Sequence, residues 1–393
     1  MNALRPLLVA LVLSTAAFVD LELRFNLPFW ELNAPVADFA ALALLVGWCF
    51  DRARYRPALL PPLPWPPALG FAAIALLSAS LSDPAHTHAS AATSAYWLIR
   101  KPIFAFLAYG HAWPAALAAL PSERVRRWIQ LSVGGLAVLS LGTSVWRIAA
   151  GDALWWAPLA GLTHNHKALA TFLAPFSGWL LWRNRPASRW LLALCLAAIA
   201  LSLSKTAWLG ASLSLAFVVH LRDRPLVSRR AATVIAGAAA IALLFALPWV
   251  AGDARLQDAA RSRRSLDLRA LEMVSDRPLL GQGPGASTGW EQTEYPHYRV
   301  NGVEAHGIVQ KVSAETGALG LLSWCAFTAA LGLRVRQRLA SESTRGERWA
   351  WAGAAAALHL QLLASTEGFT QGHWAPLGIA WYGIFRRDEA DSR

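Results

Sequence analysis

A histidine begins the stretch of the chain that is richest in chemically useful side chains. His306 stands where a long polar segment gives way to an apolar one, and Lys311 and Glu315 follow it at helical i,i+4 spacing. An unperturbed imidazole has a pKa of about 6.5, so a histidine at a water–lipid boundary can take a proton from a hydroxyl group. An interfacial histidine that only hydrogen-bonds to the preceding loop fits the same spacing, and both interpretations stay open.

Basic side chains accompany this histidine. All four lysines lie near the ends of apolar segments, on the side where His306 is expected, and several arginines join them. A charged residue within a membrane span costs roughly 2.5–3.5 kcal/mol on insertion scales and generally faces a cavity or a partner. Because arginine offers phosphate a bidentate fork and lysine a point charge, the cluster indicates an anionic ligand such as pyrophosphate. Its members include Arg100, Lys205, Arg263, Arg264 and Lys311.

Three other side chains could contact a sugar, a phosphate or a lipid. Tyr298 could stack on a sugar ring, although an aromatic belt at the membrane interface explains such residues as well. His166 lies in the polar group 164–167, and a role near glycan or phosphate is favoured over a metal site because no third ligand is apparent. Arg100, next to Lys101, could hold lipid headgroups or a lipid carrier. We therefore expect neither a metal nor another cofactor.

The segments that position these residues are apolar and long enough to cross a membrane. The chain of 393 residues is 55% hydrophobic and only 15% charged, whereas a soluble domain carries about 25% charged residues. Its apolar residues come in blocks of about 17–20, the length that spans hydrocarbon as a helix. The first block could pass for a signal peptide, but no cleavage site follows and further blocks do, so we expect it to be the first span.

The predicted fold is an all-α integral membrane domain over residues 1–393, with about 12 transmembrane helices. The net charge of +12 would suggest nucleic acid in a soluble protein, but here arginines concentrate in alternate short connections, as the positive-inside rule requires. This pattern predicts cytoplasmic termini, an extracytoplasmic site and membrane lipids rather than nucleic acid as partners. The spans are expected at 3–20, 34–50, 66–82, 92–118, 128–150, 167–182, 190–204, 206–221, 231–251, 305–333, 349–366 and 374–385.

One extracytoplasmic loop, residues 252–304, is much longer than the other connections. Its first half, 254–275, has the period of an amphipathic helix that could lie on the membrane surface. Pro278 should end that helix because proline lacks the backbone donor and clashes with the preceding turn. The run 281–285 holds three glycines and predicts a tight turn, but it lacks the Lys-Ser/Thr of a nucleotide-binding loop. Loops of this length are generally functional.

Three sequence blocks resemble the O-antigen ligase and polymerase superfamily, and they occur in that family's order. The block 202–208 (SLSKTAW) resembles its serine–arginine block, and 276–285 (DRPLLGQGPG) resembles its proline–glycine block. The third is His306 followed, after eight residues, by Glu315-x-Gly-x-x-Gly. The resemblance covers about residues 200–325; the N-terminal half is similar only in helix count and loop pattern.

The resemblance implies transfer of a glycan from undecaprenyl pyrophosphate to an acceptor sugar, such as lipid A-core, at the periplasmic face of a bacterial inner membrane. It assigns His306 to activation of the acceptor. Lys205 stands where the family carries arginine, which keeps the charge and loses the bidentate geometry. The family's second arginine would be Arg264, with Arg263 as the alternative. Glu315 would orient His306 or Lys311, or only stabilise helix packing.

Three functions stay open from the sequence. A ligase would neutralise the leaving pyrophosphate with cations and no metal, and direct attack by the acceptor hydroxyl would invert the anomeric carbon. The ligase branch usually has Asn, Ser or Gln after the histidine, whereas this chain has Gly307. A polymerase that uses one glycan repeat as both donor and acceptor is therefore the alternative. A lipid or glycan transporter fits less well, because transporters bind near the bilayer midplane and often show repeat symmetry.

Overall fold

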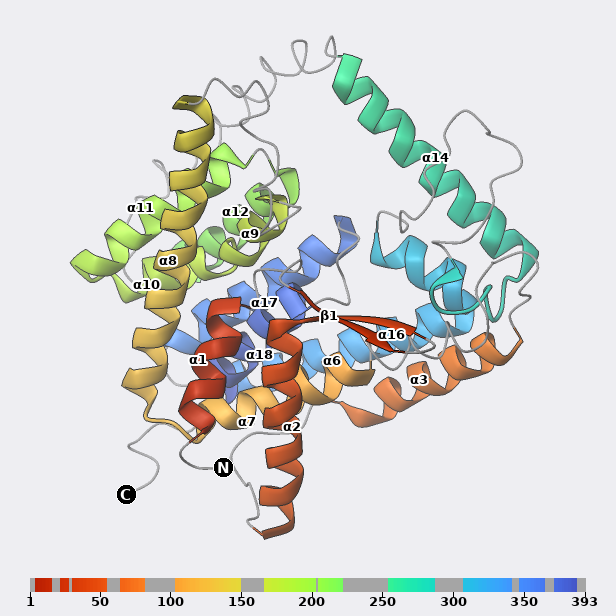
Figure 1. Cartoon of the computed structure of the whole chain (residues 1–393), viewed down its shortest axis with the longest axis horizontal. Coiled ribbons are helices and arrows are strands. Elements are labelled where there is room, and N and C mark those ends of the chain that lie inside the picture. The colour runs from red at the N-terminus through yellow and green to blue at the C-terminus, as the bar shows by residue number, and fades with distance from the viewer. Residues whose placement is uncertain are drawn as a thin grey trace.

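Helices account for nearly all of the chain that the computed structural model describes (Figure 1). The described residues are 4–15, 22–27, 30–54, 64–81, 103–149, 166–202, 204–221, 254–286, 307–340, 346–364 and 371–386. In chain order the helices are α1 (Arg5–Thr15), α2 (Val36–Arg54), α3 (Trp65–Ser80), α6 (Phe104–Leu107), the π-helical turn η2 (Ala108–Ala112), α7 (Trp113–Ala118), α8 (Ser122–Ala149), α9 (His166–Leu173), α10 (Phe176–Arg183), α11 (Pro186–Leu201), α12 (Lys205–Leu221), α14 (Ala254–Asp276), α16 (Ile308–Ala340), α17 (Glu347–Ala364) and α18 (Gln371–Phe385).

Most predicted spans coincide with these helices. The span expected at 92–118 is, in its described part, the continuous run α6–η2–α7, and the one at 167–182 is divided into α9 and α10. The division falls at Pro175, which has no N–H to continue the helical ladder. The span expected at 231–251 lies outside the described residues.

The all-α expectation needs one correction. Residues expected to form a short connection, 21–33, instead contribute to an antiparallel hairpin of β1 (Glu22–Leu27) and β2 (Trp30–Pro35). The register pairs Glu22 with Pro35 and Leu27 with Trp30. Polar and apolar residues alternate along β1, the period of a strand, so the signal was present in the sequence.

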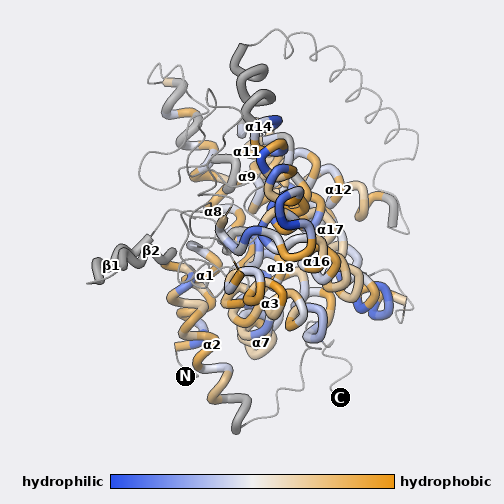
Figure 2. The backbone as a smooth tube through the Cα atoms, turned by 90° about the vertical axis from the view of Figure 1, so that its right-hand side faces the viewer, coloured by the Kyte–Doolittle hydropathy of each residue, from blue (hydrophilic) through white to orange (hydrophobic). Residues whose placement is uncertain are grey.

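The helices are apolar to different degrees, as Figure 2 shows by colour. Within the described ranges, α16 is the helix whose length and hydropathy suffice to cross a membrane. Five further apolar stretches of 10–17 residues lie in α1, α2, α3, α11 and α12. The helical class is thus confirmed, while the number of spans, the single domain and the topology stay predictions.

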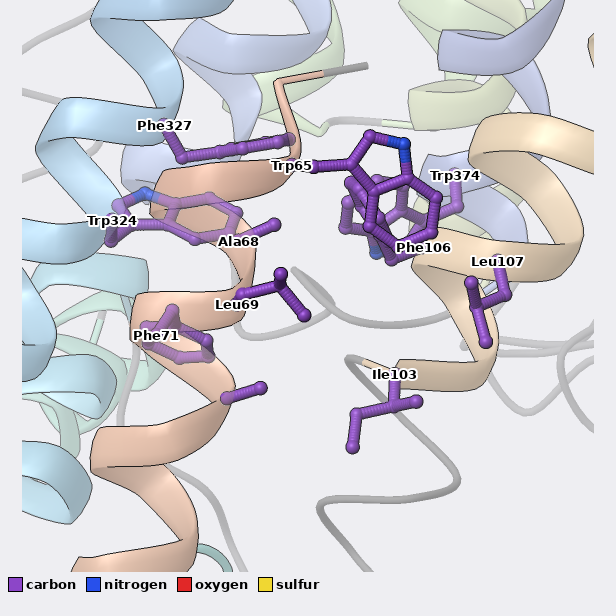
Figure 3. A pocket seen from close by; sticks show the side chains of 11 residues that line it. Trp65, Ala68, Leu69, Phe71, Ile103, Phe106, Leu107, Trp324, Phe327 and Trp374 are labelled. Atoms are coloured by element: carbon purple, nitrogen blue, oxygen red, sulfur yellow. The ribbon is translucent and has the colours of Figure 1, made fainter. Parts of the chain in front are cut away.

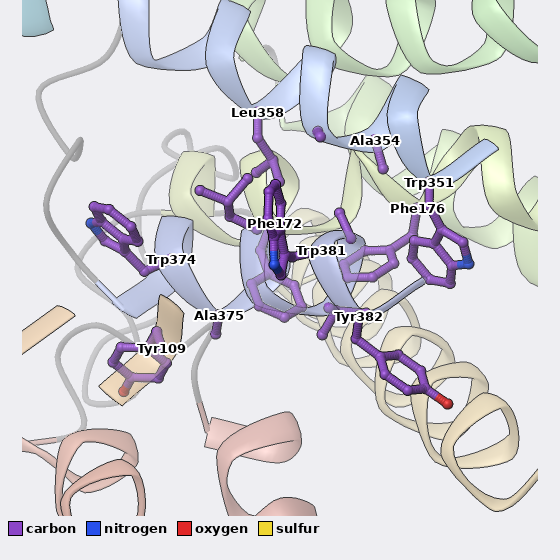
Figure 4. Close-up of a cluster of buried hydrophobic side chains, with 14 of the residues drawn as sticks. Tyr109, Phe172, Phe176, Trp351, Ala354, Leu358, Trp374, Ala375, Trp381 and Tyr382 are labelled. Atoms are coloured by element: carbon purple, nitrogen blue, oxygen red, sulfur yellow. The ribbon is translucent and has the colours of Figure 1, made fainter. Parts of the chain in front are cut away.

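The core forms where α17 and α18 pack on each other and on α7, α10 and α12. Trp113, Trp179 and Trp351 are fully buried there, and the rings of Trp179 and Trp351 stack with centroids 4.9 Å apart. Figure 4 shows Trp351 of α17 in this core, together with Phe176 of α10 and Tyr382 of α18. The indole N–H of Trp113 donates to the Ala375 carbonyl at 3.1 Å, which ties α7 to α18. Large aromatic contacts therefore join helices that lie far apart in the sequence.

A network of ions at the first turn of α17 joins several of these helices. Glu347 accepts hydrogen bonds from Arg126 of α8 at 2.7 Å, from Arg386 at 2.5 Å and from the indole of Trp179 at 2.7 Å. Burial alone would raise the pKa of Glu347, but these three partners outweigh it and hold that pKa below its usual 4.5. The carboxylate therefore stabilises the fold in its charged form.

The long loop 252–304 contains the helix expected in its first half. α14 runs from Ala254 to Asp276 and ends two residues before Pro278. It packs on α16, which in turn lies alongside α3 (Figure 1). These three elements place the candidate site.

Candidate active site

Helix α16 breaks at Gly317, the first glycine of the predicted Glu-x-Gly-x-x-Gly block. Its backbone has φ 64° and ψ −167°, outside the helical region. A side chain is disfavoured at this φ, and a Cβ atom here would collide with the backbone of Leu279 and Leu280. The position therefore requires glycine for both its conformation and its close approach to another segment.

The segment that approaches is the Pro-Gly loop, which we define as residues 277–285. A break in a helix leaves carbonyl and N–H groups without intrahelical partners, and buried ones must be paired elsewhere. The Pro-Gly loop supplies those partners through four backbone hydrogen bonds: Gln282 N to Ala314 O at 3.0 Å, Gly283 N to Glu315 O at 2.9 Å, Ala318 N to Pro278 O at 2.8 Å and Leu319 N to Leu279 O at 3.2 Å.

Three side-chain hydrogen bonds add to the junction between the Pro-Gly loop and α16. The buried amide of Gln282 donates to the Met273 carbonyl at 3.2 Å and to the Asp276 carboxylate at 2.7 Å, which fastens the loop to the end of α14. Ser78 of α3 donates to the Glu315 carbonyl at 2.8 Å. Two blocks quoted from the sequence thus form one junction, to which α3, α14 and α16 all contribute.

Lys311 and Glu315 lie in the part of α16 before the break, and they form the predicted i,i+4 pair. The Lys311 Nζ atom is 4.0 Å from Glu315 Oε1, and the two residues are only 5% and 6% exposed. A buried ion is costly unless it is paired and hydrogen-bonded. The pair therefore places a cation four residues, and a carboxylate eight residues, after Gly307, which follows His306 in the sequence.

A buried arginine, Arg269, was not among the candidates chosen from the sequence. It is 4% exposed on the face of α14 that also buries Leu266, Ala270 and Met273, and its burial lowers the pKa of the guanidinium. Arg264 is exposed, and it is the arginine that the sequence favoured. The signal that could have found Arg269 is its place within the apolar stripe of the helix, at i+3 from Leu266 and i+4 to Met273.

The starts of α12 and α16 can be related through α17, which contacts both helices. Lys205 is the first residue of α12, and Gly210, five residues later, packs against the side-chain amide of Gln361 in α17. Two residues after Gln361, the Leu363 carbonyl lies 3.0 Å from where a Cβ atom of Gly307 would stand. The start of α16 therefore lies beside the last turn of α17, which also packs on α12.

Gln361 is a further residue that the sequence interpretation did not single out. It is 1% exposed, and neither its amide nitrogen nor its amide oxygen has a hydrogen-bond partner among the described residues. A buried amide left unpaired costs free energy, so its presence here is unusual. The side chain marks the place where α12 and α17 meet, close to the start of α16.

The remaining candidates fall outside the described side chains. His306, Tyr298 and Arg100 lie outside the described residues, so their roles stay predictions. His166 is the first residue of α9, and Arg263 lies within α14; as with Lys205, their backbones are described and their side chains are not.

Comparison with known families agrees with the motifs at this junction. Residues 190–325 match the family model described as O-antigen ligase. The matched segment runs from α11 to the middle of α16 and contains all three sequence blocks, so the resemblance is confirmed over that range. Proteins of this family are multi-pass membrane proteins that transfer lipid-linked glycans. No curated protein matches the chain.

Proposed function

We propose, from the O-antigen ligase family membership of residues 190–325, that the chain is a ligase that transfers a glycan from undecaprenyl pyrophosphate to an acceptor sugar. The acceptor would be lipid A-core, and the reaction would take place at the periplasmic face of a bacterial inner membrane. The observation that supports this most is the junction of the Pro-Gly loop with the break at Gly317, because it brings two of the family's three blocks together beside a buried cation, Lys311.

The reaction proposed is a direct displacement. The acceptor hydroxyl oxygen attacks the anomeric carbon of the donor sugar while the bond from that carbon to the pyrophosphate oxygen breaks. His306 accepts the hydroxyl proton, and undecaprenyl pyrophosphate leaves with the bonding electrons. Attack from the face opposite the leaving group inverts the anomeric carbon. No metal is required where fixed cations neutralise the pyrophosphate.

The cations divide into two kinds. Lys205 and Arg264, with Arg263 as the alternative, are proposed to contact the pyrophosphate. Arg100 is proposed to hold the lipid carrier at the membrane surface. Lys311 is paired with Glu315, which compensates part of its positive charge, so only the remainder would act on the pyrophosphate. Glu315 would therefore fix Lys311 in position. Tyr298 and His166 are proposed to contact the glycan.

A polymerase of the same family is the second candidate, because Gly307 differs from the residues that the ligase branch usually has at this position. The ligase branch carries Asn, Ser or Gln at this place. Here a Cβ atom would meet the Gln310 side chain and would lie 3.0 Å from the Leu363 carbonyl, so a larger residue needs a local shift. A polymerase would join one glycan repeat to another, and its product would be a ladder of chain lengths.

The test is transfer by the purified protein in lipid nanodiscs, with undecaprenyl-pyrophosphate-linked glycan as the donor and lipid A-core as the acceptor. We expect transfer to be lost in His306→Ala and Lys205→Ala and largely kept in Lys205→Arg, which preserves the charge. Transfer by His306→Ala at the wild-type rate would contradict the mechanism. A ladder formed from the donor alone would identify a polymerase, and flux of the donor across the membrane without a new glycosidic bond would identify a transporter.

A further inference from the structure

An apolar cavity lies between α3, α6, α16 and α18, away from the charged junction (Figure 3). It has a volume of about 170 Å³, and aromatic side chains form much of its wall. Trp65, Phe71, Phe106, Trp324 and Trp374 are among them. Leu69, which also lines the cavity, is 59% exposed, so the cavity reaches the surface of the protein.

Two helices, α3 and α16, contribute both to the cavity and to the candidate active site. The rings of Phe71 in α3 and Trp324 in α16 lie 6.0 Å apart at the cavity. Seven residues further along α3, or about 10 Å of helix, Ser78 donates to the carbonyl of Glu315 in α16. The same two helices therefore form the cavity wall at one level and the charged junction at another.

One further residue of the cavity wall follows two predicted cations in the sequence. Ile103, which lines the cavity, comes two residues after Lys101 and three after Arg100. A ligand with a charged headgroup at the junction and an apolar chain along α3 and α16 would match both regions. A water-soluble ligand would match only one of them.

We propose that this cavity binds the first part of the polyprenyl chain of the lipid-linked donor, an inference that rests on the proposed function. The volume suits it, because a cavity of about 150 Å³ lined by apolar side chains holds a six-carbon ring, and an isoprene unit has five carbons. The lining contains no charged residue.

The cavity adds position and selectivity more than affinity. A chain that leaves the lipid for an apolar wall gains little hydrophobic free energy, since lipid tails are as apolar as the side chains, and only packing distinguishes the two environments. Rigid aromatic walls pack well against a methyl-branched chain that is placed in one orientation. Seating the chain would hold the pyrophosphate at a defined distance from the acceptor.

The test fills the cavity without touching the charged residues. Ala68 lines the cavity, and Ala68→Trp would occupy it. Ala73 lies on the same helix with an exposed side chain and does not line the cavity, so Ala73→Trp is the matched control. Two donors carry the same glycan, one on undecaprenyl pyrophosphate and one on methyl pyrophosphate, a short donor that has no isoprene unit to place in the cavity.

With the long donor we expect Ala68→Trp to raise KM by about three- to tenfold, which corresponds to a loss of about 0.6–1.4 kcal/mol of binding free energy. The KM for the short donor, and both KM values of Ala73→Trp, should stay at the wild-type level. An unchanged KM for the long donor in Ala68→Trp would overturn the proposal. Equal increases in Ala68→Trp and Ala73→Trp would do so as well.

A second measurement does not depend on transfer. Undecaprenyl pyrophosphate with a photoreactive diazirine in its first isoprene units is crosslinked to the wild-type protein in nanodiscs, and the labelled peptides are identified by mass spectrometry. We expect labels on residues 64–81 and 318–334. Labels elsewhere would overturn the proposal, and labels that excess phospholipid removes would show that the cavity takes ordinary acyl chains instead. Correct labelling without any glycan transfer would retain the cavity assignment and reject the proposed function.

Discussion

Gly281 of the Pro-Gly loop lies against the backbone of Gly317 at the break in α16. A Cβ atom on Gly281 would stand 2.5 Å from the backbone atoms between Glu315 and Thr316, and one on Gly317 would collide with Leu279. Both residues have positive φ, at 66° and 64°. The two glycines therefore permit an approach that no other residue type allows, and four hydrogen bonds depend on it.

The first prediction concerns Gly317. Gly317→Ala should destabilise the protein by more than the roughly 1–3 kcal/mol of a non-glycine residue in strained backbone, because it adds a collision with Leu279. Glycan transfer should fall with it. The control is Gly332→Ala in the same helix, where no atom lies within 4 Å of the added Cβ and alanine should be neutral or mildly stabilising. Thermal unfolding in detergent separates the two, and equal melting temperatures would contradict the role of the break.

The second prediction concerns the buried pair of Lys311 and Glu315. Removal of one partner leaves an uncompensated buried charge, so Lys311→Met or Glu315→Gln alone should cost about 3–5 kcal/mol. The double variant should cost less than the sum of the two, because no charge is then stranded. Unfolding free energies in a double-mutant cycle measure this coupling. Additive costs would mean that the two side chains do not interact.

The third prediction concerns pH. Arg386, the Trp179 indole and Arg126 lower the pKa of Glu347 against the opposing effect of burial. A group whose pKa is lower in the folded state contributes stability that is fully present above its unfolded pKa, here about 4.5. That contribution should be lost as the pH falls below about 4.5 and through the folded pKa. Unfolding of the wild type and of Glu347→Gln between pH 7 and pH 3 measures the difference, which should narrow as the pH falls. A difference in unfolding free energy between the two proteins that does not change with pH would exclude this link between the Glu347 pKa and stability.

The fourth prediction separates the two arginines of α14. Arg264 is exposed, so Arg264→Gln should leave the melting temperature unchanged; if it contacts the pyrophosphate, the donor KM should rise. Arg269 is buried, and Arg269→Gln should lower the melting temperature because the shorter side chain packs less well. Donor KM and melting temperature, measured for both variants, test the assignment. A raised donor KM in Arg269→Gln alone, without loss of stability, would transfer the phosphate role from Arg264 to Arg269.

Local sequence patterns were sufficient for the helices and for the motifs. Blocks of apolar residues marked most of the elements from α1 to α18, and Pro278 correctly marked the end of α14, because helix formation and termination depend on residues close in the sequence. The i,i+4 pairing of Lys311 and Glu315 also followed from helical geometry alone. The strand period of β1 was equally local, yet it lay in a segment expected to be a short connection.

Only the tertiary structure decided how these elements combine. The spacing of the glycines did not reveal that α16 breaks at Gly317, because that backbone conformation is stabilised by hydrogen bonds from the Pro-Gly loop about 35 residues earlier. The apolar stripe of α14 included Arg269, but only the packing of that face on α16 showed that this arginine is buried while Arg264 is exposed. A sequence specifies the conformations available to each segment, whereas the contacts between distant segments determine which of them is adopted.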